Sequence, residues 1–243
     1  MKLATSIFLA FAAVVCFAQD EPIPSPTSLK YEAYRAQTTE PTYGLKKVKA
    51  LISKIKTNRD DDSILDAKLY NGLSFEEKFT YNMLHGEYFD QNCSEMPIFI
   101  HSEKKIFAYP TGAFNDEAMW SERQQDFLKK NRTKVIGLLR ATIRTRGRVG
   151  SNLRAAILEI NAVELIPDMV RTYSKDRKDH DILTTLMVMM STAKFRPFMA
   201  SPIYNKLYAD ENTSYKAYVD ATKTTEDQII HIANFFFKDR KRA

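Results

Sequence analysis

Regular spacing of apolar residues is the feature that most constrains how this chain can fold. From Gly44 onward, apolar residues recur at steps of three and four with lysines between them, a period typical of an amphipathic helix. Two further helices are predicted from capping residues: one begins at the capping box Ser74-Phe-Glu-Glu77, and one runs from a cap at Asn115 or Asp116 through Phe127. Comparable apolar patterns predict helices over 64–70, 135–143, 151–161, 164–173, 181–192, 197–208 and 225–238. The fold class is therefore predicted to be mainly α.

One segment departs from this helical period. Between residues 93 and 115 the apolar runs Ile98–Ile100 and Ile106–Tyr109 flank the polar stretch His101–Lys105. Short apolar runs around a polar connection indicate paired strands. We therefore expect a small β-hairpin near residues 97–109.

The second half of the chain contains an internal similarity at an offset of 30 residues. It aligns Leu153, Ala156, Ile157 and Ile160 with Leu183, Leu186, Met187 and Met190, and Pro167, Met169 and Val170 with Pro197, Met199 and Ala200. Residues 151–210 thus resemble HEAT or armadillo repeats, whose antiparallel helical hairpins stack into an array. The resemblance implies a surface for binding partners and no particular activity. An irregular helical bundle is the alternative.

The first eighteen residues have the pattern of a secretory signal peptide. Lys2 is followed by the apolar run Ile7–Phe17 and a small-residue exit at Ala18. Such a run is too short for a bilayer core, which needs about 20 residues. We predict an exported protein, periplasmic or secreted, with no transmembrane segment in the mature chain. Lipidation of Cys16 is the alternative reading of this segment.

The mature chain is expected to divide into two parts. Residues 19–43 contain four prolines among small polar residues, which favours an extended linker or arm. This arm either holds the folded part away from a surface or lies across it through Tyr31 and Tyr34. Residues 44–243 are predicted to form a single helical domain. Only Cys93 remains as a thiol after cleavage, so the fold must rest on hydrophobic burial; Cys93 is buried, free or paired with another chain.

Charge is the strongest chemical feature of the sequence. Nine lysines and arginines and no acidic residue lie between Phe127 and Leu158. Within this block Arg140, Arg144 and Arg148 are predicted to share one exposed helix face, and three guanidinium groups in a row suit phosphate, sulfate or carboxylate groups. The competing interpretation is a solvated face paired with acids such as Asp116, Glu117 and Glu122.

A second cluster has residue types that enzymes use. In the segment from His85 to Cys93, a thiol, an imidazole, Glu87 and Asp90 lie close in sequence, and a cysteine with a histidine can form an activated nucleophile. The spacing places Cys93 about two helical turns from His85, too far for contact unless the chain folds back. Phosphate-binding glycine loops, paired metal-ligand spacings and nucleophile elbows do not occur, so we expect no cofactor and no metal.

The sequence thus favours an exported, non-catalytic helical scaffold that binds a macromolecular partner. That partner is a protein or an anionic macromolecule of the envelope or the extracellular space, contacted through Arg140, Arg144 and Arg148. Two alternatives remain, an enzyme of unfamiliar design centred on residues 85–93 and a self-associating structural envelope protein. The source, bacterial or eukaryotic, is left open.

Overall fold

The structure is a computed structural model that describes residues 23–90, 99–114, 117–210 and 214–242. Within these ranges it is mainly α, which confirms the predicted fold class. The α-helices are α1 (Pro26–Ala36), α2 (Leu45–Ile52), α3 (Ala67–Asn71), α4 (Phe75–Leu84), α5 (Glu122–Lys130), α6 (Arg132–Arg146), α7 (Ser151–Glu159), α8 (Ile166–Tyr173), α9 (His180–Thr192), α10 (Arg196–Met199), α11 (Pro202–Tyr208) and α12 (Lys223–Arg240). No described helix has both the length and the apolar character needed to cross a membrane.

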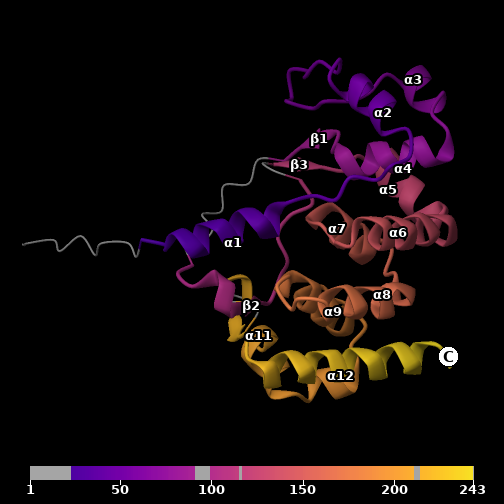
Figure 1. Ribbon diagram of the computed structural model, residues 1–243. Helices are drawn as coiled ribbons and strands as arrows, with labels where there is room; N and C mark the ends of the chain where they lie inside the picture. Colours follow the sequence, from indigo (N-terminus) through magenta and orange to yellow (C-terminus); the bar gives the residue numbers. More distant parts are fainter. Residues whose placement is uncertain (1–22, 91–98, 115–116, 211–213, 243) are drawn as a thin grey trace, which may run out of the picture.

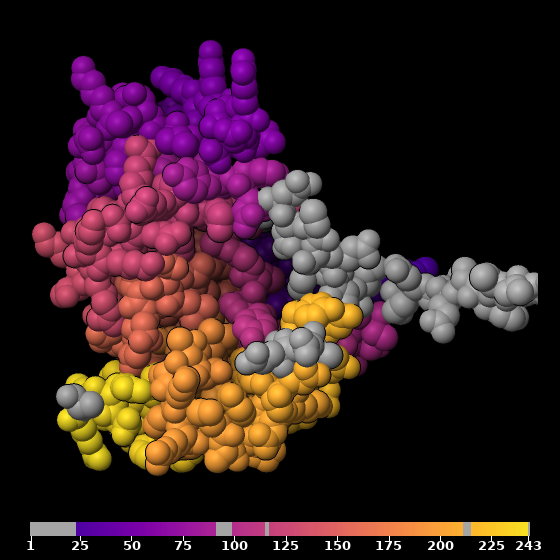
Figure 2. Space-filling view, turned by 180° about the vertical axis from the view of Figure 1, so that it is seen from behind, coloured from indigo at the N-terminus to yellow at the C-terminus, as the bar shows by residue number. Residues whose placement is uncertain are grey.

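The helices are stacked in layers that follow the order of the chain (Figure 1). Helix α2 packs on α4, α4 on α7, α7 on α9, and α9 on α12, while α6 lies against α8. Figure 2 shows the same succession from the opposite side, with α2 at one end and α12 at the other. A large core runs through the layers from α4 to α12, and a smaller one beneath α2 includes Val48, Tyr70 and Tyr81.

Local sequence signals account for where several helices begin. Ser74 and Glu77 form the predicted capping box at the start of α4. Helix α5 begins later than predicted, at Glu122, because Ser121 and Gln124 form a second capping box there. The earlier caps considered for it, Asn115 and Asp116, lie outside the described residues. The helix expected over 197–208 is divided into α10 and α11, because Ser201 caps a new helix that begins at Pro202.

The two segments related by the 30-residue offset agree in part. The offset aligns α7 with α9 and α8 with α10, and α7 packs on α9. The matched positions of the first helices are buried: Leu153, Ala156, Ile157 and Ile160 in α7 or at its end, and Leu183, Leu186, Met187 and Met190 in α9. The second helices do not match in this way, because Met169 is buried whereas its counterpart Met199 is exposed. Burial of this kind also occurs in an irregular bundle, so the likeness to HEAT or armadillo repeats stays a prediction.

Two small antiparallel sheets join distant parts of the chain. Strand β1 (Tyr88–Phe89) pairs with β3 (Ala118–Met119), and β2 (Lys105–Phe107) pairs with β4 (Tyr218–Asp220). Strand β2 lies where the hairpin near 97–109 was expected. Its partner is β4, with Ile106 opposite Val219, and Ile98 lies outside the described residues. The remaining regular elements are the 3₁₀ turns η1 (Ser102–Lys104), η2 (Val163–Leu165) and η3 (Ser214–Lys216).

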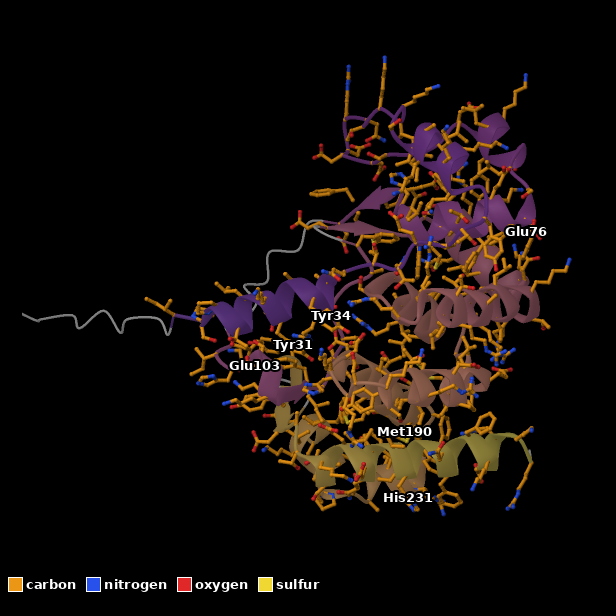
Figure 3. The ribbon with its side chains drawn as sticks, viewed as in Figure 1. Tyr31, Tyr34, Glu76, Glu103, Met190 and His231 are labelled. Carbon is orange, nitrogen blue, oxygen red and sulfur yellow. The ribbon has the colours of Figure 1, made fainter. Side chains whose placement is uncertain are left out.

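Part of the segment expected to be extended is helical. Helix α1 begins with Pro26 at its first position, where the missing N–H costs no hydrogen bond, and Ser25 caps it by accepting a bond from the Ser28 amide. Proline composition therefore misled the prediction of extended backbone over 26–36. Tyr31 and Tyr34 point from α1 toward the body of the protein (Figure 3), so this stretch lies across the domain.

The chain after α1 runs tightly along the start of α7. The Gly150 amide donates to Thr39 Oγ1 at 2.9 Å, and the Asn152 amide group donates to Thr39 O at 3.0 Å and to Met83 O at 2.7 Å. A Cβ atom at Gly150 would lie 2.4 Å from the Thr39 nitrogen. Only glycine allows the two backbones to approach this closely.

Replacing Gly150 with alanine is therefore expected to destabilise the fold. The added methyl group would push against backbone, and overpacking of this kind costs about 1–3 kcal/mol. Gly137→Ala is the matched control, because nothing lies within 4 Å of its Cβ position on α6, and alanine is expected to stabilise that helix by up to about 1 kcal/mol. Urea unfolding measures both effects. Equal stability of the two variants would contradict the close approach at Gly150.

Candidate functional site

Two of the three predicted arginines meet at one carboxylate. Arg140 and Arg144 lie one turn apart on α6, and their guanidinium groups contact Asp168 in the first turn of α8, with Arg140 Nε 3.1 Å from Oδ2 and Arg144 Nη2 2.9 Å from Oδ1. Arg171, three residues further along α8, places Nη1 3.1 Å from the same Oδ1. We call these four residues the Asp168 cluster. A carboxylate in the first turn of a helix is also stabilised by the helix dipole.

The Asp168 cluster carries an excess of positive charge. Three arginines share one carboxylate whose side chain is 5% exposed, whereas the side chains of Arg144 and Arg171 are 58% and 62% exposed. Glu164 is nearby, but its carboxylate binds Arg132, with distances of 2.7 and 2.8 Å, and this hydrogen-bonded pairing lowers the pKa of Glu164. Arg140 reaches only the backbone oxygen of Glu164. Among the residues that the structure describes, two charges of the cluster therefore face solvent without a carboxylate of their own.

Arg148 lies apart from the other two predicted arginines. Gly147 adopts the left-handed conformation, with φ of 67°, and ends α6. The guanidinium of Arg148 then lies 4.0 Å from the centre of the Tyr34 ring and donates to the Tyr34 backbone oxygen. The prediction of a single helical stripe through all three arginines is therefore wrong, because the helix ends before the third.

The rest of the basic block is largely paired. Lys129 lies 2.6 Å from Glu159, and Lys130 lies 2.7 Å from Asp126. Arg146 donates to the backbone oxygen of Glu40. The acid that pairs with Arg140 and Arg144 is Asp168, which the sequence analysis did not single out. Arg171 was missed as well, because a contact between two helices leaves no signal in the period of either one.

A buried ionic network lies where α1, α7 and α9 meet. Arg154, on α7, is fully buried and places Nη1 3.2 Å from both Asp179 oxygens and Nη2 3.1 Å from Asp181 Oδ2. Arg35, on α1, donates to Asp181 Oδ1 from Nε at 3.1 Å and from Nη2 at 2.9 Å. Thr111 also donates to Asp181 through its amide and its hydroxyl. The network joins three distant segments of the chain.

Its two carboxylates respond differently to burial. Burial disfavours ionisation of Asp181, but the positive charges of Arg35 and Arg154 and the bonds to this carboxylate prevail and lower its pKa. At Asp179, burial prevails over the attraction of Arg154 and raises the pKa to about 6. Asp179 is therefore the member of the network that titrates near neutral pH.

Of the residues predicted around His85, Glu87 is the centre of a buried hydrogen-bonded network. Glu87 is fully buried and accepts bonds from Tyr81, Ser121 and Arg123, which together outweigh the effect of burial and lower its pKa. Burial lowers the pKa of His85, whose Nε2 lies 2.5 Å from the Ser63 backbone oxygen. A cavity of about 360 Å³ adjoins both residues.

Asp90 and Cys93 are the remaining predicted members of the His85 cluster. The Asp90 amide donates to Glu117 O at 2.9 Å, and Cys93 lies outside the described residues. The hydrogen bonds of Glu87 join α4, α5 and the connection before α3. Within the described ranges, no group of three or more histidine, cysteine, aspartate or glutamate residues is arranged to hold a metal ion.

Comparison with protein-family models, with curated proteins and with solved structures finds no match. The function is therefore inferred from the residues of this chain.

The raised pKa of Asp179 predicts a specific dependence of stability on pH. The folded protein binds a proton at this carboxyl near pH 6, whereas the unfolded chain binds it only near pH 4, so the unfolding free energy contributed by Asp179 rises as the pH falls from 7 to 5. Asp179→Asn removes this titration. Relative to the variant, the wild type is expected to gain about 1 kcal/mol over that range.

Urea unfolding of both proteins at pH 7 and pH 5 measures this difference. Burial lowers the pKa values of His85 and His180, so their contribution to the unfolding free energy becomes less favourable as the pH falls. They are present in both proteins, so their contribution cancels in the comparison. Parallel pH profiles for wild type and Asp179→Asn would contradict the raised pKa.

Proposed function

We propose that the protein is an exported, non-catalytic helical scaffold that binds an anionic macromolecular partner of the envelope or extracellular space through the Asp168 cluster. The observation that carries the proposal is the sharing of one buried carboxylate by three arginines, two of them more than half exposed. Asp168 holds the guanidinium groups in place, while their excess charge faces outward.

The geometry favours recognition of oxyanions. Guanidinium groups bind phosphate, sulfate and carboxylate oxygens through paired, charge-assisted hydrogen bonds. An arginine side chain held in one orientation before binding loses less conformational entropy when a ligand arrives. Two helices supply the cluster, and its guanidinium groups converge on one carboxylate, so closely spaced negative groups of one polymer are able to meet its excess charge.

The proposed location rests on the sequence. The first eighteen residues have the features of a signal peptide. In the compartments that such a segment leads to, sulfated or phosphorylated glycans and acidic lipids are anions that the cluster is able to meet.

Binding of the mature chain, residues 19–243, to immobilised heparin across a salt series tests the proposal. Heparin stands in for a sulfated polymer. Arg144→Gln combined with Arg171→Gln removes the two excess charges and leaves Arg140 paired with Asp168, so the fold is expected to be retained. The dependence of log K on log salt is expected to lose a slope of about two, because two fewer counterions are released on binding.

The matched control removes the same charge from the far end of the stack. Lys54→Gln combined with Lys56→Gln alters two exposed lysines that follow α2. This control is expected to bind heparin nearly as well as the wild type. Equal weakening by both double variants would mean that net charge alone drives binding, and unchanged binding by the arginine variant would refute the proposal.

A further inference from the structure

A pocket lies beside the basic surface, where the end of α6 meets α1, α8 and α9. Its volume is about 220 Å³, and its lining includes Tyr34, Arg148, Lys175 and Asp179. Cavities that hold drug-sized ligands usually exceed about 300 Å³, whereas a water molecule takes up about 30 Å³. The pocket is therefore of a size for a small chemical group.

The guanidinium of Arg148 is held in one orientation at this pocket. It is held on one face by the Tyr34 ring and through Nη2 by the Tyr34 backbone oxygen. Within the described parts of the chain this is its only hydrogen bond, and its buried Nε has no partner. A guanidinium has five donor hydrogens. One is bonded to Tyr34 and the Nε–H is buried, so the three remaining N–H groups on the Nη atoms are left for a ligand.

Lys175 adds a second positive charge. Its Nζ atom lies 3.7 Å from the position that a Cβ atom of Gly147 would occupy, next to Arg148. Among the described residues no acceptor is bonded to this ammonium group, whose side chain is exposed. Gly147 has no side chain, so this edge of the pocket stays open, and its left-handed conformation favours glycine at this position.

Arg148 attracts Asp179 as well, but the acids in the lining offset the two cations only in part. Both oxygens of Asp179 bind Arg154, and Asp181 binds Arg35 and Arg154. The charges of the two aspartates and two arginines in the buried network therefore sum to zero. Asp176 is the remaining acid of the lining and lies at the rim. It accepts a hydrogen bond from the Lys178 amide. The pocket therefore keeps a positive balance.

The pocket continues the surface of the Asp168 cluster. Arg144 lies in the last turn of α6, which ends just before Gly147 and Arg148, and Arg171 lies in the last turn of α8, which ends two residues before Lys175. We infer that this pocket is a subsite for the phosphate or sulfate ester group of the anionic partner, held by Arg148 and Lys175 while the Asp168 cluster contacts further charges of the same molecule. A phosphate or sulfate ester presents three acceptor oxygens to the donors of Arg148 and Lys175, whereas a carboxylate presents two. The inference rests on the proposed function and assigns it a ligand chemistry.

Calorimetric titration of the mature chain with inorganic phosphate, inorganic sulfate, glycerol phosphate and acetate tests the subsite. The first three are expected to bind, and acetate to bind about tenfold more weakly or not at all, since it lacks one charge. Glycerol phosphate that binds like inorganic phosphate supports an ester group as ligand. Binding of the inorganic ions with exclusion of glycerol phosphate overturns it, as does the absence of binding by all of them.

Three variants separate this subsite from the rest of the surface. Arg148→Gln and Lys175→Gln are each expected to weaken binding of glycerol phosphate about tenfold or more, through loss of a charged hydrogen-bond donor. Lys175 is exposed, so its variant tests the subsite even where Arg148→Gln loosens α1. Lys178→Gln, an exposed lysine outside the pocket lining, is the control and is expected to leave binding unchanged. Equal effects of Lys175→Gln and Lys178→Gln would overturn the subsite.

Heparin binding then distinguishes the two proposals. If the subsite is real, Lys175→Gln and the Arg144 and Arg171 double variant both weaken heparin binding, while the double variant still binds glycerol phosphate. If only the double variant weakens heparin binding, the proposed function stands and the subsite is refuted. If neither variant does so, both proposals fail.

Discussion

Two arginines and two aspartates share one buried site between α1, α7 and α9, and the positions of these three helices depend on how those charges are arranged. Removing four charges from water is costly, and each charge must find an opposite partner and hydrogen bonds inside. Arg154 meets this need by binding Asp179 and Asp181 at once and by donating to the Val149 and Arg35 backbone oxygens. Such a set specifies one arrangement, because displacing one member leaves the others buried and unpaired.

This network also explains why α1 belongs to the fold. The helix is short and has a mostly polar surface, so hydrophobic burial alone would hold it weakly. Arg35 anchors its end, with the guanidinium 4.2 Å from the centre of the Phe107 ring. Tyr31 accepts a hydrogen bond from the His180 amide one turn earlier. The helix is thus fixed by a few directional contacts.

The sequence predicted what local rules decide. The helical period and the capping box at Ser74 both appear in the structure, because each depends on residues close together in the chain. The helix over 26–36 was missed, because prolines generally favour extended backbone whereas Pro26 stands at a helix start. The pairing of β2 with β4 and the contacts of Asp168 join residues far apart in sequence. Such contacts are set by packing, which has no local signature.

The same reasoning separates the roles of the basic residues. In the sequence Arg140, Arg148 and Arg154 are equivalent members of one charged block, yet the fold places them at an exposed cluster, in a pocket wall and in the core. Burial decides the difference: a fully buried arginine needs every acceptor it can reach, whereas a half-exposed one keeps donors for a ligand. Tyr34 connects these environments, because α1, held by the buried network, presents the ring and the backbone oxygen that orient Arg148. The internal charges thus fix the wall against which an external anion is expected to bind.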